Sequence, residues 1–353
     1  MGVFYITLIT TYILGYLARE AGTQKEDELK TPNTIFFIMV TAIFIAVCGL
    51  RSNIGDTYFY KHSYDLMIMT GEVFGYEKGF AKLMLFLGTI SPDPQILIFV
   101  TGFITNLFIL LSLRREATYF EVSVYLFITS GYYLVTMNGM RQTMVAALYF
   151  FFGVKFIREK KLIFYVLLIF ILSYFHKSVI FMLPSYFLAR EEAFSKKMVL
   201  IILGTILIVL MFSSFAGIIK DIAGDYGYYI DSFNEGGANI LRVLVNVVPV
   251  GMAYLYREEL KSRWADSHIF INFSILNLIF YILSLQNWIF ARVGLYAAIA
   301  NFLLIPYIIS RCMDEGKKTF FYLACMICYF IFFYYEQAIS MFIVYRSVIL
   351  GIY

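Results

Sequence analysis

Long apolar runs separated by short polar segments recur along almost the whole chain. A run of roughly 17 to 20 apolar residues is long enough to cross the hydrocarbon core of a membrane as a helix. The runs are continuous and do not alternate apolar with polar residues, as the strands of a membrane barrel would. We therefore expect an all-α fold, in a polytopic membrane protein whose single domain covers residues 1–353. About twelve membrane spans are predicted, near residues 2–18, 33–50, 95–113, 119–136, 141–157, 162–175, 178–189, 198–215, 241–257, 269–285, 293–310 and 319–335.

The composition agrees with this class. Hydrophobic residues make up 61% of the chain and charged residues 15%, with a mean hydropathy of +0.77. A soluble domain, by contrast, is about 45–50% apolar and about 25% charged. The first span has no basic segment before it and no small-residue cleavage site after it, so we expect a retained helix and not a signal peptide. Cys325 and Cys328 form a CxxC pair inside the last span, where we expect them to pack and not to bind a metal.

The basic residues are distributed unevenly between alternate loops. One set of alternate loops holds 18 of the 28 Lys and Arg residues. Short loops rich in Lys and Arg stay in the cytoplasm, so this set predicts the cytoplasmic face and places the N-terminus outside. The formal charge of +4 is modest, and the bias between loops explains where the basic residues lie. No nucleic-acid partner is therefore expected. The loops of the basic set are residues 19–32, 114–118, 155–161, 190–197, 256–268 and 311–318.

Two loops on the predicted outer face are long, residues 51–94 and 216–240. The first begins RSNIGDTYFYKHSYD and then carries apolar residues at helical spacing from Phe80 to Ile90, which indicates a helix at the membrane interface. The sequence SPDP, at residues 91–94, ends that helix because proline removes a backbone donor. The second loop is rich in Gly and Tyr, a composition that fits a flexible gate, a sugar-contacting surface or an ordinary solvated loop.

Six cations at span ends on the predicted outer face point to a shared anion site. The positive-inside bias disfavours cations on this face, so several at one depth indicate an anionic ligand at the outer leaflet. Any one of them alone is explained better by a side chain that reaches toward lipid phosphates, and only the set of six favours the shared site. The six are Arg51, Arg141, Lys177, Arg242, Arg292 and Arg346.

Two short motifs sharpen this prediction. In MNGMRQTMV, residues 137–145, Arg141 opens a predicted span, so the amides at the helix N-terminus should point toward the same anion site. In FHKS, residues 175–178, His176 stands beside Lys177, whose charge favours a neutral imidazole that accepts a proton or a hydrogen bond. Almost no charge lies in the middle of a span, unlike in ion-coupled carriers. We therefore expect the site to open to the periplasm or the exterior.

These motifs together resemble the EpsG family of polysaccharide polymerases, which belongs with the Wzy-type O-antigen and capsule polymerases. The resemblance covers most of the chain. Its most specific part is the RQ at the head of one span, followed by the HKS at the next outer turn. The stretches that carry the resemblance are RSNIGDTYFYKH, GYEKGFAKL, GMRQTMVAALYFFFGVKFI, YFHKSVIFMLPSYFL, ARVGLYAAIANFLLIP and IVYRSV.

The resemblance implies a membrane glycosyltransferase similar to those of the GT-C type, at the outer face of the bacterial cytoplasmic (inner) membrane. Such an enzyme transfers a growing glycan from undecaprenyl pyrophosphate onto a newly flipped lipid-linked repeat unit. It is expected to need no metal or other cofactor. Its partners are then the lipid-linked donor and acceptor oligosaccharides and the membrane lipids, and the sequence leaves a chain-length regulator open as a further partner.

The polar residues suit this chemistry. Negative charge develops on the leaving pyrophosphate, so cations should hold it while a base takes the proton of the attacking hydroxyl. Arginine binds phosphate oxygens with a planar fork and stays charged. We therefore expect Arg141 and Arg292 at the pyrophosphate and either Asp56 or His176 as the base, with Asp56 narrowly preferred. The residues predicted to assist in substrate binding are Arg51, Asn138, Gln142, Lys177 and Arg242.

Three other function classes stay open. A flippase or exporter of lipid-linked oligosaccharide would carry polar residues along several spans and not only at one end. A ligase would use the same donor with a different acceptor, and the sequence hardly separates it from a polymerase. Acyl transfer to an extracellular glycan rests only on the outer-facing His176.

Overall fold

The described part of the chain is almost entirely helical. The computed structural model describes residues 1–24, 30–73, 75–201, 203 and 237–353. Within these ranges only two short strands occur, and they pair antiparallel, β1 (Thr23–Gln24) with β2 (Lys30–Thr31). The prediction of an all-α fold is therefore confirmed. The GT-C type and the count of twelve spans stay predictions.

The chain divides into two compact units. Unit 1 consists of Met1–Ile180 and Ile309–Tyr353, and unit 2 consists of Phe181–Ile308. Unit 1 therefore joins the first half of the chain to its C-terminal end. That the two units behave as the single membrane domain expected from the sequence stays a prediction.

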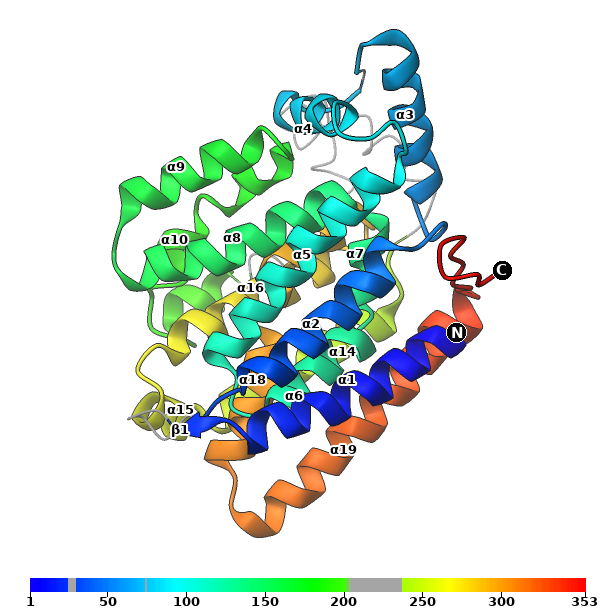
Figure 1. Cartoon of the computed structure of the whole chain (residues 1–353). Coiled ribbons are helices and arrows are strands. Elements are labelled where there is room, and N and C mark those ends of the chain that lie inside the picture. Colours follow the sequence, from blue (N-terminus) through cyan, green and yellow to red (C-terminus); the bar gives the residue numbers. More distant parts are fainter. Residues whose placement is uncertain (25–29, 74, 202, 204–236) are drawn as a thin grey trace. The chain divides into compact units, whose positions relative to one another are not determined.

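Helices that run side by side form the body of unit 1 (Figure 1). They are α1 (Gly2–Glu20), α2 (Thr34–Gly49), α5 (Gln95–Glu116), α6 (Phe120–Thr129), α8 (Met140–Arg158), α9 (Leu162–Ser173) and α19 (Glu315–Phe333). In this body α2 packs against α1 and α5, α8 packs against α5 and α9, and α6 packs against α1 and α19. Except for α6, their bounds follow the predicted spans closely, because each apolar run ends at a polar or glycine-containing turn.

The predicted outer loop 51–94 contains two helices, α3 (Thr57–Thr70) and α4 (Lys78–Gly88). The expected helix at the apolar run is confirmed as α4, whereas α3 was not predicted. Both helices lie at the end of unit 1 where α5 begins (Figure 1). Their inner faces form one apolar cluster with residues of α5 and α8. The fully buried members of this cluster are Tyr64, Phe80, Met84, Leu97 and Ile98.

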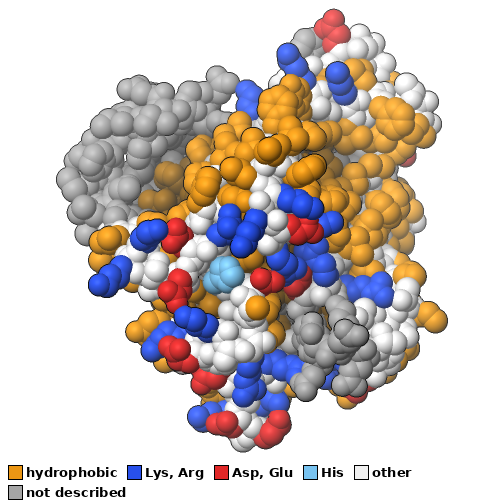
Figure 2. Space-filling model, turned by 90° about the vertical axis from the view of Figure 1, so that its left-hand side faces the viewer, with side chains coloured by type: hydrophobic (Ala, Val, Ile, Leu, Met, Phe, Trp, Pro, Cys, Tyr) orange, Lys and Arg blue, Asp and Glu red, His pale blue; other side chains and the backbone are white. Residues whose placement is uncertain are grey.

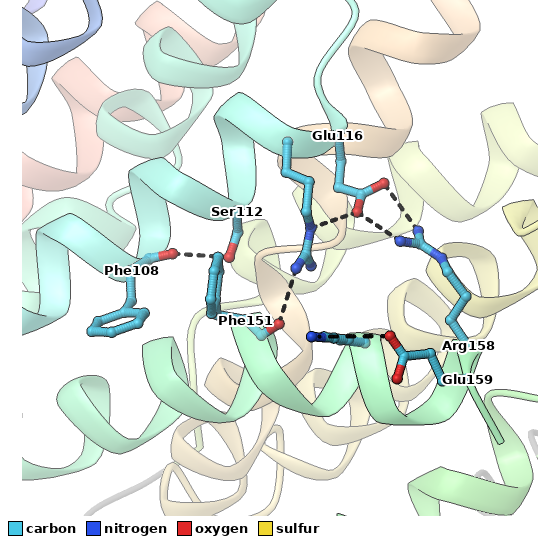
Figure 3. A network of polar contacts seen from close by, with 8 residues as sticks. Phe108, Ser112, Glu116, Phe151, Arg158 and Glu159 are labelled. Atoms are coloured by element: carbon cyan, nitrogen blue, oxygen red, sulfur yellow. Dashed lines mark hydrogen bonds and ion pairs between the residues drawn. The ribbon is translucent and has the colours of Figure 1, made fainter. Parts of the chain in front are cut away.

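The C-terminal ends of α5 and α8 are joined by ion pairs (Figure 3). Glu116, on α5, accepts two parallel hydrogen bonds of 3.0 Å from the guanidinium of Arg158, on α8. Arg115 adds a third contact, with Nε 2.8 Å from Oε1 of Glu116. This bidentate geometry fixes how α5 and α8 lie against each other. These ion pairs lie in loops that the charge bias assigns to the cytoplasmic face.

The predicted span 119–136 is broken in the structure. The helix α6 stops at Thr129, and α7 (Tyr132–Asn138) starts after Gly131, which has a φ of +82°. A left-handed residue cannot continue an α-helix, so the chain changes direction there. A second break at Gly139 separates α7 from α8 and leaves Arg141 in the first turn of α8. These two breaks set the position of the candidate site.

Unit 2 contains the other described helices. They are α10 (Ser185–Leu188), α14 (Ile240–Leu255), α15 (Arg257–Arg263), α16 (Ser267–Leu283), α17 (Ile289–Ala298) and α18 (Asn301–Tyr307). The helix α16 packs against α14, α17 and α18. The predicted span 178–189 appears as a short 3-10 helix, Lys177–Met182, followed by α10 after Pro184. Most of the predicted span 198–215 and of the loop 216–240 lies outside the described residues.

Within the described ranges, three helices are long and apolar enough to cross a membrane by length and composition, or up to five if each bent pair is one span. The three are α1, α5 and the helix Glu315–Ser340 that includes α19. Large apolar side chains are also exposed outside the core, such as Ile9 at 60% and Ile163 at 74%. Figure 2 shows broad hydrophobic areas on the face turned to the viewer. Such surfaces are typical of helices that contact lipid.

Candidate functional site

The turn after α2 is built around Arg51, whose side chain is 0% exposed. Its guanidinium donates to the Oγ1 of Thr57 at 3.1 Å, to the carbonyl of Met137 at 2.7 Å and to the carbonyl of Cys48. These contacts join the end of α2 to the start of α3 and the end of α7. They also satisfy a buried charge, which is costly to leave without partners. Contact between Arg51 and a ligand would require these bonds to open.

The C-terminal segment lies against this turn (Figure 1). The side chain of Asn53 donates to the carbonyl of Val344 at 2.7 Å and accepts from the backbone N–H of Arg346 at 2.9 Å. The Oγ of Ser52 accepts from the backbone N–H of Val348 at 2.9 Å. Two motifs that the sequence places almost 300 residues apart therefore form one structure.

Asp56 follows in the same turn and begins α3. Its backbone N–H donates to the Oδ1 of Asn138 at 3.1 Å, and its carboxylate does not cap α3. Gly55 has a φ of +51°, and a Cβ at this position would lie 2.2 Å from the same Oδ1. The turn thus requires glycine both for its backbone conformation and for its close approach to Asn138.

Arg141, in the first turn of α8, is surrounded by groups from α3 and α4. Its Nε donates to the hydroxyl of Tyr60 at 3.3 Å, and its Nη1 makes a short ion pair with Oε2 of Glu77. The ring of Tyr76 lies 4.7 Å from the guanidinium carbon and the ring of Phe80 lies 5.8 Å from it. The charge is therefore held at the head of α8 by a carboxylate, a phenol and two aromatic faces.

Glu77 links this arginine to the HKS motif. Its Oε1 lies 3.3 Å from Nδ1 of His176 and accepts the backbone N–H of Lys177 at 3.2 Å. Its Oε2 contacts Arg141. One carboxylate thus holds together the two motifs that the sequence singled out, with side-chain exposures of 10% for Glu77, 15% for His176 and 22% for Arg141.

The backbone supports this arrangement directly. The N–H of Gly79 donates to the carbonyl of Tyr174 at 2.7 Å, and a Cβ on Gly79 would lie 2.7 Å from the same oxygen. Only glycine allows this close approach of α4 to the turn that carries His176. The GYEKG stretch therefore places Glu77 and Tyr76 beside Arg141.

The electrostatics keep Glu77 ionised. Burial by itself raises the pKa of this carboxyl, but the neighbouring His176 and Arg141 outweigh that effect and lower the pKa from 4.5 to about 2. Opposite charges at this distance favour the charged form of each partner. The cation of Arg141 is therefore paired with an anion in the structure.

The other predicted residues are placed as follows. Gln142 is buried on α8 with an exposure of 4%, and the side chain of Lys177 is exposed. In unit 2, Arg242 lies in the first turn of α14, and the guanidinium of Arg292 stacks on the ring of Trp288 at 4.7 Å. The structure thus brings together the predicted site residues of unit 1. The role of each predicted residue in catalysis or binding stays a prediction.

No group of three His, Cys, Asp or Glu residues within the described ranges is arranged to hold a metal ion. The expectation that no cofactor is needed stays a prediction. Glu77 is the residue that reasoning from the sequence missed. In the sequence it is one charge just before the apolar run 80–90, and no local spacing connects it to Arg141, which lies 64 residues away.

The arrangement suits the binding of an anionic ligand. A guanidinium, a histidine and a helix N-terminus face one region of unit 1, and a carboxylate already contacts the guanidinium. Asp56, Asn138 and Tyr60 lie on elements joined to the same region. A guanidinium, an imidazole and the carboxylate of Asp56 thus lie on adjoining elements, a set of groups that acid–base chemistry can use.

Comparison with known proteins gives one match. The model of the EpsG family matches residues 34–347. This range includes α2 through α19 and every residue of the candidate site. No curated protein and no solved structure matches the chain.

Proposed function

The chain belongs to the EpsG family, a family of membrane proteins similar to the Wzy-type polysaccharide polymerases, and from this premise we propose that it polymerises a lipid-linked glycan. The donor in this proposal is an oligosaccharide on undecaprenyl pyrophosphate, and the acceptor is a single lipid-linked repeat unit. The reaction takes place at the outer face of the cytoplasmic membrane. The observation that carries the proposal is the guanidinium of Arg141, placed at the head of α8 beside a carboxylate and the HKS motif.

The proposed reaction is the displacement of pyrophosphate by a sugar hydroxyl. The hydroxyl oxygen of the acceptor forms a bond to the anomeric carbon of the donor, and the bond from that carbon to the phosphate oxygen breaks. The electron pair of the broken bond stays on the pyrophosphate, where Arg141 stabilises the new charge. Lys177, beside His176 in unit 1, adds positive charge in this proposal, and the roles expected from the sequence for Arg242 and Arg292, which lie in unit 2, stay predictions.

A base must take the proton of the attacking hydroxyl. Asp56 suits this task because its carboxylate does not cap α3 and its backbone is fixed by Asn138. His176 is the second candidate, and its contact with Glu77 orients the imidazole. Gln142 follows Arg141 in the first turn of α8 and is buried, so in this proposal it supports the site from within unit 1. Arg51 supports the site through the turn that carries Asp56.

The test is the analysis of lipid-linked oligosaccharides by length. A deletion strain is complemented with the wild-type gene or with Arg141→Ala at matched expression. We expect the mutant to accumulate single repeat units on undecaprenyl pyrophosphate at the outer leaflet, while long polymer disappears. Normal polymer from Arg141→Ala would remove this residue from the mechanism.

Transport of the lipid-linked unit is the second candidate function. It is favoured by two amides inside the helices of unit 2 and a third at the start of α18, since Asn246 accepts from Asn277 at 2.6 Å and from Asn301 at 3.2 Å. These residues come from α14, α16 and α18, so polar groups are not confined to helix ends. In the same experiment a flippase would leave single units on the cytoplasmic side, and a ligase would leave long lipid-linked chains untransferred.

A further inference from the structure

The anion position at Arg141 is already filled by a side chain of the protein. Oε2 of Glu77 contacts Nη1 of Arg141, and both side chains are largely buried. A carboxylate and a phosphate present oxygen acceptors to a guanidinium in the same way. Any anionic ligand that binds Arg141 through this nitrogen must therefore compete with Glu77.

The carboxylate of Glu77 is not needed by its own helix. Glu77 occupies the N-cap position of α4, but its side chain does not cap that helix. The carboxylate instead turns toward residues from two other segments, Arg141 and the turn of His176 and Lys177. Its contacts therefore belong to the anion site and not to the folding of α4.

Each carboxylate oxygen of Glu77 contacts different residues. Oε1 accepts the N–H of Lys177 and lies beside His176, whereas Oε2 contacts Arg141. The contact to Arg141 can therefore open while Oε1 keeps the carboxylate in place. A ligand that carries more negative charge than one carboxylate would gain more from the guanidinium than Glu77 does.

We propose that Glu77 is an internal counter-anion, which the pyrophosphate of the donor lipid replaces at Arg141. This inference rests on the proposed function, because it names the ligand of the same site. Glu77 neutralises the buried arginine while the site is empty, so the charge does not have to be exposed to lipid. It also opposes weakly charged ligands, since a single carboxylate or a phosphate diester gains little by replacing it.

The test measures binding of farnesyl pyrophosphate, a short polyprenyl pyrophosphate, to the purified full-length chain. Glu77→Gln keeps the size of the side chain and removes its charge. We expect this variant to bind the probe roughly fivefold more tightly, because a competing ion pair is lost. Glu72→Gln is the matched control, because Glu72 is an exposed acid five residues away. It should bind the probe as the wild type does.

The opposite role for Glu77 predicts the opposite result. If Glu77 serves only to position Arg141, its loss leaves the arginine misplaced and Glu77→Gln binds the probe less tightly. Equal or weaker binding by a variant that elutes like the wild type and is folded at the assay temperature overturns the proposal. Should Glu77→Gln fail to fold, Glu77→Asp replaces it. The shorter side chain lengthens the contact to Arg141, so tighter binding is again expected and unchanged binding overturns the proposal.

One more variant separates this inference from the proposed function. Arg141→Ala should lose binding of farnesyl pyrophosphate whether or not Glu77 competes for the site. Binding that depends on Arg141 but is not strengthened by Glu77→Gln overturns the counter-anion alone. Wild-type affinity in Arg141→Ala, or no binding by any variant, overturns the pyrophosphate site itself and with it the inference.

Discussion

At the scale of single residues, the guanidinium of Arg141 is the centre of the candidate site. It donates to Tyr60, pairs with Glu77 and stacks on Tyr76 at the same time. A planar group with several donors can make these three contacts together, whereas an ammonium group is a compact point charge. The identity of the cation should therefore matter as much as its charge.

Arg141→Lys is expected to lower polymerisation strongly although the charge is kept. Loss of a donor that stabilises developing charge costs roughly a hundredfold in rate. Glycan length is measured in the deletion strain, with protein level followed in the same membranes. Arg257→Lys, which makes the same exchange at an exposed position of a loop predicted to be cytoplasmic, is the control and should give normal polymer. Normal polymer from both variants would contradict the role of the guanidinium.

The pairing of Glu77 predicts a dependence of stability on pH. The pKa of its carboxyl is about 2 in the folded chain and 4.5 ordinarily, so its contribution to stability is present above pH 4.5 and is lost as the pH falls toward 2. We expect the melting temperature of the wild type to exceed that of Glu77→Gln above pH 4.5, and the difference to shrink below it. A difference that stays constant over this range would argue against the ion pair.

Gly55 offers a test of the turn that carries Asp56. Gly55→Ala must place a Cβ 2.2 Å from Oδ1 of Asn138 at a φ of +51°. Gly71→Ala is the matched control, because Gly71 also has a positive φ, +75°, but has no atom within 4 Å of the added Cβ. Backbone strain alone costs about 1 kcal/mol. We expect the free energy of unfolding to fall further in Gly55→Ala, and equal losses would show that the contact with Asn138 is absent.

Single residues also show which parts of the candidate site the sequence reveals and which it does not. Arg141 and His176 stand out in the sequence because polar groups at the ends of apolar runs are unusual, and their roles stay predictions. Glu77 does not stand out, because an acid among lysines in a polar segment has no local signal. Its role depends on the close approach of Gly79 to Tyr174, which is a tertiary contact.

At the scale of elements, long apolar runs predicted the apolar helices well. Helices that mix polar and aromatic residues were not predicted. The helices α2, α5, α8 and α19 match predicted spans. The helix α3 was missed because TYFYKHSYDLMIMT mixes aromatic and polar residues, and its buried face appears only when Tyr60, Tyr64 and Met67 pack on α5. The break at Gly131 was missed because a single glycine does not interrupt an apolar run.

The docked C-terminal segment gives a prediction at this scale. The amide of Asn53 makes hydrogen bonds to Val344 and Arg346, so Asn53→Ala should release the segment from the turn after α2. We expect faster hydrogen exchange at residues 344–348 and in the turn 51–56. Asn33→Ala, which removes the cap of α2 at its other end, should leave exchange at 344–348 unchanged. Unchanged exchange in Asn53→Ala would contradict the docking.

At the scale of the whole molecule, the charge bias assigns a side to each end of unit 1. The candidate site lies where α5 and α8 begin, and the ion pairs of Glu116 lie where they end. The positive-inside rule places the second group in the cytoplasm and the first outside. The predicted orientation therefore places the proposed reaction on the outer face.

Cysteine labelling can test this orientation. In a background without the four natural cysteines, Glu72→Cys places a thiol near the candidate site and Lys317→Cys places one in a basic loop. Both positions are exposed. A membrane-impermeant maleimide should label the first in intact spheroplasts and the second only after lysis. The reverse pattern would invert the predicted topology and place the site in the cytoplasm.

The stacking of Arg141 on Tyr76 also provides an optical handle. The chain contains only two tryptophans, Trp264 and Trp288, and both belong to unit 2. An indole in place of the Tyr76 ring would keep the aromatic face 4.7 Å from the guanidinium and make it fluorescent. Its emission would then respond when a pyrophosphate replaces Glu77 beside the guanidinium that the ring contacts. The site can thus report its own occupancy in real time, without a labelled substrate.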